Sequence, residues 1–180
     1  FIQFAHNDQK PQSRSYIEPF TGYKKYLKYF IKQAREKGAI PVLVTPMHRR
    51  TFDENGKIVN SHGDYPEAMR QAANEENVAL IDLFHMSTVL FESLGSEGSK
   101  KAFVHYHAGT FPGQNEELND DTHFSNYGAY ELAKCVVEGI KSNQIELEKY
   151  LVDDVQTFDP NHPDSFNSWN LPVSPLIPTL

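Results

Sequence analysis

Residues 39–45 read Ala-Ile-Pro-Val-Leu-Val-Thr, a short and nearly continuous apolar run. Such a run is typical of a β-strand that is buried on both faces, as in a parallel sheet covered by helices. A second run of this kind, Val-Ala-Leu-Ile-Asp-Leu, occupies residues 78–83, and residues 1–5 resemble the end of a third strand. The sequence therefore predicts at least three buried strands, spaced about 40 residues apart.

Helical patterns separate these strands. Apolar residues fall at helical spacing over residues 23–37, and Pro66 suits the first turn of a second helix. A third helix is expected at residues 86–94, and a fourth begins after Ser125, a good N-cap residue. Alternating strands and helices predict an α/β fold with a parallel sheet and right-handed crossovers. Residues 95–119 are rich in loop-forming residues, and we expect a loop there.

Composition narrows the class of protein. A chain of 180 residues suits one domain, and its formal charge of −7 argues against a nucleic-acid partner. No apolar run is long enough to span a membrane, and the single cysteine, Cys135, excludes an internal disulfide. Beyond Tyr150 the chain becomes rich in proline. We therefore expect a domain over residues 1–149 and an extended tail over 150–180, either docked on the domain or mobile.

The clearest chemical signal is Asp120-Asp121-Thr122-His123, which directly precedes the fourth helix. An aspartate that accepts a hydrogen bond from Nδ1 of a histidine fixes its tautomer and leaves Nε2 free to take a proton. Asp120 and His123 are therefore a candidate acid and general base. The alternative is a surface loop whose acids complement the helix dipole, and the two residues alone favour that alternative.

Two further groups of polar residues are candidates for chemistry. Asn7 follows the first strand, where its amide can stabilise an oxyanion, although the residue by itself favours an Asx turn. His105 and His107 lie on one side of an extended segment, and with His6, Asp8 and Asp120 they could form a zinc site. The sequence lacks a helical His-Glu-x-x-His motif or a cysteine pair. We therefore expect neither a metal nor another cofactor, and a metal-dependent hydrolase is the least favoured alternative.

Taken together, these segments resemble the SGNH (GDSL) hydrolases, in particular the rhamnogalacturonan acetylesterase branch. The resemblance covers about residues 1–142 and rests on residues 4–10, 40–46, 49–50, 62–66, 78–83 and 120–129. It implies a three-layer, flavodoxin-like parallel sheet with helices on both faces. It also implies a serine esterase that removes acetyl groups from pectic polysaccharide, in the secreted or periplasmic space. In such an enzyme His123 would be the general base, Asp120 its orienting acid and Asn7 an oxyanion-hole donor, whereas Asp121 does not hold the matching position.

The chain departs from this family at its start. The Gly-Asp-Ser block that carries the nucleophile is absent, as are the glycine block of the oxyanion hole and the first two strands. Alanine also stands at position 5, where the family usually has glycine. We expect the strand at residues 1–5 to have an open edge, covered by a separate N-terminal piece of the same protein, a second copy or the tail. On this view the isolated chain is inactive, and the competing hypothesis is an inactive carbohydrate-binding or assembly module.

Overall fold

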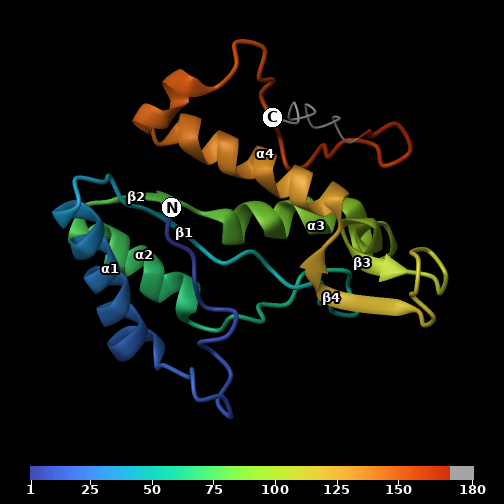
Figure 1. The fold of residues 1–180 in the computed structure, drawn as a ribbon, viewed down its shortest axis with the longest axis horizontal. Helices are drawn as coiled ribbons and strands as arrows, with labels where there is room; N and C mark the ends of the chain where they lie inside the picture. The colour runs from blue at the N-terminus through green and yellow to red at the C-terminus, as the bar shows by residue number, and fades with distance from the viewer. Residues whose placement is uncertain (171–180) are drawn as a thin grey trace, which may run out of the picture.

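The computed structural model describes residues 1–170 and has a mixed α/β fold (Figure 1). The elements are, in chain order, η1 (Pro19–Tyr23), α1 (Lys24–Glu36), β1 (Val42–Val44), α2 (Tyr65–Glu76), β2 (Ala79–Ile81), α3 (Leu83–Gly98), η2 (Ser99–Ala102), β3 (Phe103–Tyr106), β4 (Leu118–Phe124), α4 (Asn126–Ser142) and η3 (Glu146–Tyr150). The last ten residues of the predicted tail, 171–180, lie outside the described residues.

The two predicted apolar runs form a parallel pair. β1 pairs with β2, with Leu43 opposite Leu80. The third predicted strand is reduced to a bridge between Ile2 and Leu43, in which Ile2 N donates to Val42 O at 2.8 Å and Ile2 O accepts from Val44 N at 3.0 Å. The expected parallel arrangement of these three segments is therefore confirmed, although each paired stretch is shorter than its apolar run.

Helices cover both faces of this small sheet. Because strand side chains alternate between faces, Val42 and Val44 join the core formed with α3 and α4, whereas Leu43 joins the core formed with α1 and α2. Figure 1 shows α1 and α2 on one side of the strands and α3 and α4 on the other. Burial on both faces explains why the sequence of β1 is continuously apolar.

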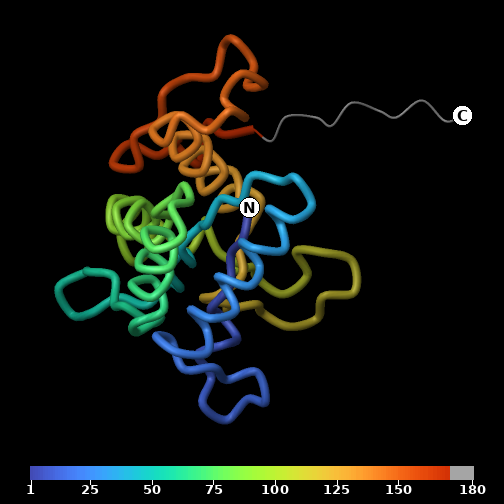
Figure 2. Tube along the Cα trace, turned by 90° about the vertical axis from the view of Figure 1, so that its left-hand side faces the viewer, coloured from blue at the N-terminus to red at the C-terminus, as the bar shows by residue number. Residues whose placement is uncertain are grey.

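The prediction of a loop over residues 95–119 is wrong in part. Phe103 begins β3, which pairs with β4 in an antiparallel sheet, with Tyr106 opposite Leu118. β3 has the aromatic and β-branched residues that favour strands, whereas β4 reads Leu-Asn-Asp-Asp-Thr-His-Phe and has few of them. Pairing with β3 is what makes this polar segment extended. The connection between β3 and β4 stands out from the body of the molecule (Figure 2).

The described part of the tail docks on α4. Tyr127 Oη donates to the carbonyl oxygen of Asp164 at 2.7 Å, and Phe158 N donates to Glu138 Oε1 at 3.1 Å. Phe158 and Trp169 pack against the core between α3 and α4. Tyr150, at the start of the tail, lines a cavity together with Phe1, so the covering of residues 1–5 by the tail stays a prediction.

That strand keeps an exposed apolar edge. Phe1 is 60% exposed and Phe4 is 46% exposed, and Phe4 stacks on Phe30 of α1 at a centroid distance of 5.4 Å. Exposed aromatic side chains on the neighbouring α1, Tyr26 and Tyr29, extend this surface. Within residues 1–170, no helix combines the length and apolar character needed to cross a membrane.

Candidate active site

Strand β4 and the start of α4 are held in place by bonds to η2. Ser125 N donates to the carbonyl oxygen of Ala102 at 3.1 Å, and Ser125 Oγ donates to that of Lys101 at 2.6 Å. Ser125 Oγ also accepts from Gly128 N at 3.2 Å, so the predicted N-cap is confirmed. These bonds fix where β4 ends, one residue after His123.

Asp120 and His123 form a direct pair on β4. Nδ1 of His123 lies 2.6 Å from Oδ2 of Asp120, and the other carboxylate oxygen accepts from the backbone N–H groups of Thr122 at 2.7 Å and His123 at 2.9 Å. The hydrogen bond with the histidine ring, joined by these backbone bonds, lowers the pKa of Asp120 to about 2. At neutral pH the carboxylate of Asp120 is therefore ionised, and both of its oxygens accept hydrogen bonds.

This arrangement leaves one nitrogen of the ring available. With Nδ1 bonded to a carboxylate, the neutral ring carries its proton on Nδ1 and its lone pair on Nε2. Nε2 has no hydrogen-bond partner among residues 1–170, and the side chain is 77% exposed. The ring can therefore accept a proton from a hydroxyl group that comes within hydrogen-bond distance of Nε2.

Geometry within the pair is not sufficient by itself to identify a base. Asp159 and His162 in the tail have the same spacing, and Nδ1 of His162 lies 2.9 Å from Oδ2 of Asp159. The sequence patterns did not predict that pair, and its carboxylate also accepts from Asn161 N at 2.9 Å. The residues around His123 must therefore decide whether its pair with Asp120 is catalytic or only stabilises the local structure.

Those surroundings include the turn that carries Asn7. The charge of His123 contributes to the low pKa of His6, about 4, for which burial is the main cause. The carbonyl oxygen of His6 accepts from Nη2 of Arg49 at 3.0 Å, and its ring packs edge-on against that of His62 at 4.5 Å. The segment after β1 and the turn after residues 1–5 thus meet beside β4, at the carboxyl ends of the parallel strands, where ligands bind in open α/β sheets.

Asn7 itself is exposed in this turn. Its Oδ1 accepts from Nζ of Lys10 at 2.8 Å, and its Nδ2 has no hydrogen-bond partner among the described residues. The turn is closed by Asp8, whose carboxylate accepts from Ala5 N at 2.9 Å. The donor that an oxyanion would use is therefore unoccupied, and its predicted role stays a prediction.

Asp121 has a different environment from Asp120. Its Oδ1 lies 2.7 Å from Nη1 of Arg50 and 2.7 Å from Nε2 of His105, and its carbonyl oxygen accepts from Arg50 N at 2.9 Å. These contacts tie β4 to β3 and to the segment after β1. The sequence alone did not predict that Arg50 supports the strand that carries His123.

Three of the residues considered for a zinc site are hydrogen-bonded to other groups. His105 bonds to Asp121, Asp8 closes the turn at Ala5, and Asp120 bonds to His123. Among residues 1–170, no group of three or more His, Cys, Asp and Glu side chains has the geometry to hold a metal ion.

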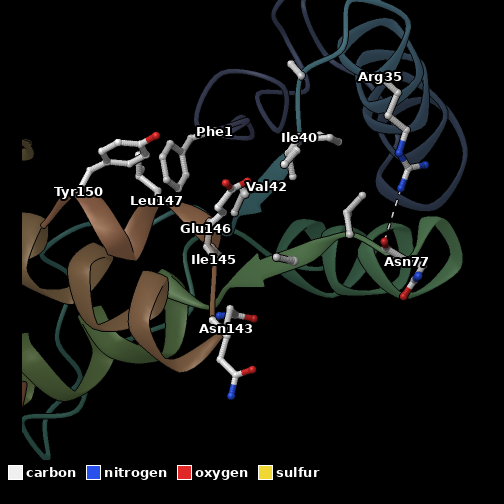
Figure 3. A pocket seen from close by; sticks show the side chains of 15 residues that line it. Phe1, Arg35, Ile40, Val42, Asn77, Asn143, Ile145, Glu146, Leu147 and Tyr150 are labelled. Carbon is white, nitrogen blue, oxygen red and sulfur yellow. Dashed lines mark hydrogen bonds between the residues drawn. The ribbon is translucent and has the colours of Figure 1, made fainter.

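A large cavity lies away from His123. It has a volume of about 620 Å³ and lies between Phe1, the starts of β1 and β2, and η3. Figure 3 shows Phe1, Leu147 and Tyr150 along one side and Ile40 and Asn77 on the other. This cavity adjoins the C-terminal end of α4, whereas His123 precedes its N-terminal end, and a helix of 17 residues spans about 25 Å.

Comparison with known proteins finds relatives among bacterial esterases, although no protein-family profile matches the chain. Rhamnogalacturonan acetylesterase RhgT of Bacillus subtilis (strain 168) is 45% identical over 151 residues, which are 84% of this chain and 64% of RhgT. The probable rhamnogalacturonan acetylesterase YesY of the same strain is 43% identical over 153 residues, which are 84% of this chain and 66% of YesY. The chain thus spans slightly less than two thirds of the length of these relatives.

A solved structure also matches. The crystal structure of YxiM from Bacillus subtilis, described as an uncharacterized esterase, superposes with a TM-score of 0.64 at 28% identity. The match covers 80% of this chain and 36% of YxiM. The predicted resemblance to the rhamnogalacturonan acetylesterases is therefore confirmed, and so is an esterase-like α/β fold over part of the relatives' length.

Proposed function

We propose that this chain forms the part of a carbohydrate esterase that carries the general base, because it is homologous to rhamnogalacturonan acetylesterases over most of its length. Its substrate would be acetylated rhamnogalacturonan, and its reaction the hydrolysis of acetyl esters. The substrate class rests on the two relatives at 45% and 43% identity. The role of this chain rests on one observation, the 2.6 Å bond that holds His123 with Nε2 open to solvent.

In this mechanism Nε2 of His123 takes the proton of a serine hydroxyl as its oxygen attacks the acetyl carbonyl. The ionised carboxylate of Asp120 stabilises the imidazolium that forms, and Nδ2 of Asn7 donates to the oxyanion. The imidazolium then gives its proton to the departing sugar oxygen. Water, activated by the same nitrogen, attacks the acetyl-serine and releases acetate.

The nucleophile would come from a segment that precedes Phe1 in the complete protein. Such a segment would complete the three-layer, flavodoxin-like sheet by pairing along residues 1–5, whose outer edge is exposed and apolar at Phe1 and Phe4. The preceding segment would reach Phe1 through the groove in Figure 3, which Phe1 lines. A second copy of this chain on the same edge is the alternative, and size-exclusion chromatography with light scattering distinguishes a dimer from a completed monomer.

Acetate release from acetylated rhamnogalacturonan tests the enzymatic proposal. In the complete protein, His123→Ala is expected to lower kcat/KM by a factor on the order of 10⁴ or more. His162→Ala is a matched control, because it removes a histidine with the same spacing and a similar 2.9 Å bond to an aspartate. Equal loss in both variants, or none in His123→Ala, would refute the assignment of the base.

The isolated chain provides a second test. We expect the 180-residue chain to be inactive toward aryl acetates and to gain His123-dependent activity when the preceding segment is supplied. Activity of the isolated chain would show that one of its own residues is the nucleophile. An inactive complete protein would instead favour a carbohydrate-binding or assembly module. Because a polysaccharide substrate lies outside the cytoplasm, we also propose a secreted or periplasmic location, which cell fractionation tests.

A further inference from the structure

A second cleft adjoins Ser125, the residue that follows β4. Its volume is about 380 Å³, within the range of about 300–1,000 Å³ typical of small-molecule sites. Its walls come from β3, the first turn of α4 and the tail, and its lining includes Lys101, His107, Tyr106, Tyr127, Phe166 and Trp169. The proposed function does not use these residues.

Aromatic rings form much of its surface. Tyr106 packs edge-on against Phe111 at 4.9 Å, and Tyr127 packs edge-on against Phe166 at 5.4 Å and Trp169 at 5.6 Å. Phe166 remains 42% exposed, so its ring is available to a ligand. Flat apolar rings are suited to the apolar faces of pyranose sugars.

The charge at the cleft is positive in a protein that is negative overall. Lys101 has no carboxylate within 4 Å among the described residues, and its Nζ lies 5.1 Å from the centre of the Phe166 ring. Two acids on neighbouring segments are already paired with other groups: Asp121 with Arg50 and His105, and Asp164 with Lys134 at 2.9 Å. An unpaired ammonium group beside an exposed aromatic ring favours a ligand that carries both a sugar face and a carboxylate.

We infer that this cleft binds a uronate residue of the polysaccharide, stacked on Phe166 and with its carboxylate facing Lys101. The inference rests on the proposed function for its substrate class, since rhamnogalacturonan contains galacturonate. It adds a binding subsite close to the end of β4, to which the tail contributes Phe166 and Trp169. Docking of the tail on α4 would then serve substrate binding, because Phe166 and Trp169 reach the cleft only through it.

Intrinsic fluorescence provides a readout specific to the cleft. Trp169 is the only tryptophan of the 180 residues and lines this cleft. Titration with a tetragalacturonide is expected to change a fluorescence signal that disappears in Trp169→Phe. Lys101→Gln should weaken binding about 3-fold or more, as expected for a partly exposed ion pair, and should leave binding of neutral galactotetraose unchanged. Phe166→Ala should weaken binding of both about 5- to 10-fold.

Matched controls lie at the C-terminal end of η3, where Tyr150 borders the groove of Figure 3. Lys149 lies over Tyr150 at 5.1 Å, so Lys149→Gln and Tyr150→Ala remove a similar pair of side chains elsewhere, and both should bind normally. Binding that is absent, or equal in Lys101→Gln, Phe166→Ala and the unaltered protein, would overturn the inference. His123→Ala separates the two proposals, because it should abolish acetate release and retain tetragalacturonide binding. Normal acetate release without tetragalacturonide binding would overturn the uronate subsite alone.

Discussion

The approach of α4 to η2 allows no side chain at position 128. A Cβ atom added to Gly128 would lie 1.9 Å from the carbonyl oxygen of Ala102, 2.7 Å from its carbonyl carbon and 2.9 Å from its Cα. All three are backbone atoms, and the same carbonyl accepts the bond from Ser125 N. Gly128→Ala must therefore move the helix away from η2 or break that bond.

Two effects of opposite sign decide the outcome. Alanine is favoured over glycine within a helix by about 1 kcal/mol, which alone would stabilise the variant. Overpacking against a fixed backbone costs about 1–3 kcal/mol and sometimes more. At a separation of 1.9 Å we take the upper end, so the free energy of unfolding should fall by about 2 kcal/mol. For a chain of this size the melting temperature should fall by about 4–8 °C.

Thermal unfolding followed by circular dichroism measures this change. Gly139→Ala is the matched control on the same helix, since its Cβ would meet side-chain atoms of Ile81, the nearest being Cγ2 at 2.4 Å, and not backbone atoms. We expect a smaller loss of stability in that variant. A melting temperature of Gly128→Ala at or above that of the unaltered protein would refute the packing argument and leave helix propensity as the dominant effect.

Three further predictions concern charge and capping. Lys134 bridges the fully buried Glu131 at 3.0 Å and Asp164 at 2.9 Å. Lys134→Met should therefore lower the free energy of unfolding, measured by urea titration, by about 3 kcal/mol. Lys141→Met breaks a more exposed pair with Glu138 and should lower it by less than about 1 kcal/mol. Burial lowers the pKa of His48 to about 4 and that of His62 to about 3, whereas the ordinary pKa of histidine is 6.5. Below pH 6.5 the unfolded chain therefore binds more protons than the folded chain, and the free energy of unfolding should fall as the pH drops from 6.5 toward 4. This loss should be smaller in His62→Gln, and an equal loss would contradict the assignment. Ser125→Ala removes both the N-cap and the bond to Lys101, so its unfolding free energy should fall by about 1–2 kcal/mol, and an unchanged value would show that the cap is dispensable.

The sequence predicts the parallel part of the fold because its signals there are local. Two apolar runs become β1 and β2, and Ser125 caps α4 as expected. The antiparallel pair was missed because β4 is polar and is extended only through its pairing with β3. β3 has strand-favouring residues, but no local pattern in residues 118–124 marks β4 as its partner.

The candidate site follows the same division. Asp120 and His123 are three residues apart, and their bond was predictable from that spacing. The partners of Asp121, at positions 50 and 105, are distant in the chain and were not predictable without the fold. The cleft at Lys101 was missed for the same reason, because the tail supplies Phe166 from 65 residues away.

We propose that Asp120, and not its neighbour Asp121, orients His123 as the general base. The most direct measurement compares kcat/KM for acetate release by the Asp120→Asn and Asp121→Asn variants of the complete protein. Because Asp120 bonds to the ring and Asp121 bonds to Arg50, we predict a fall on the order of 10³–10⁴ in the first variant and less than about tenfold in the second. Equal rates in the two variants, or the larger loss in Asp121→Asn, would contradict the account.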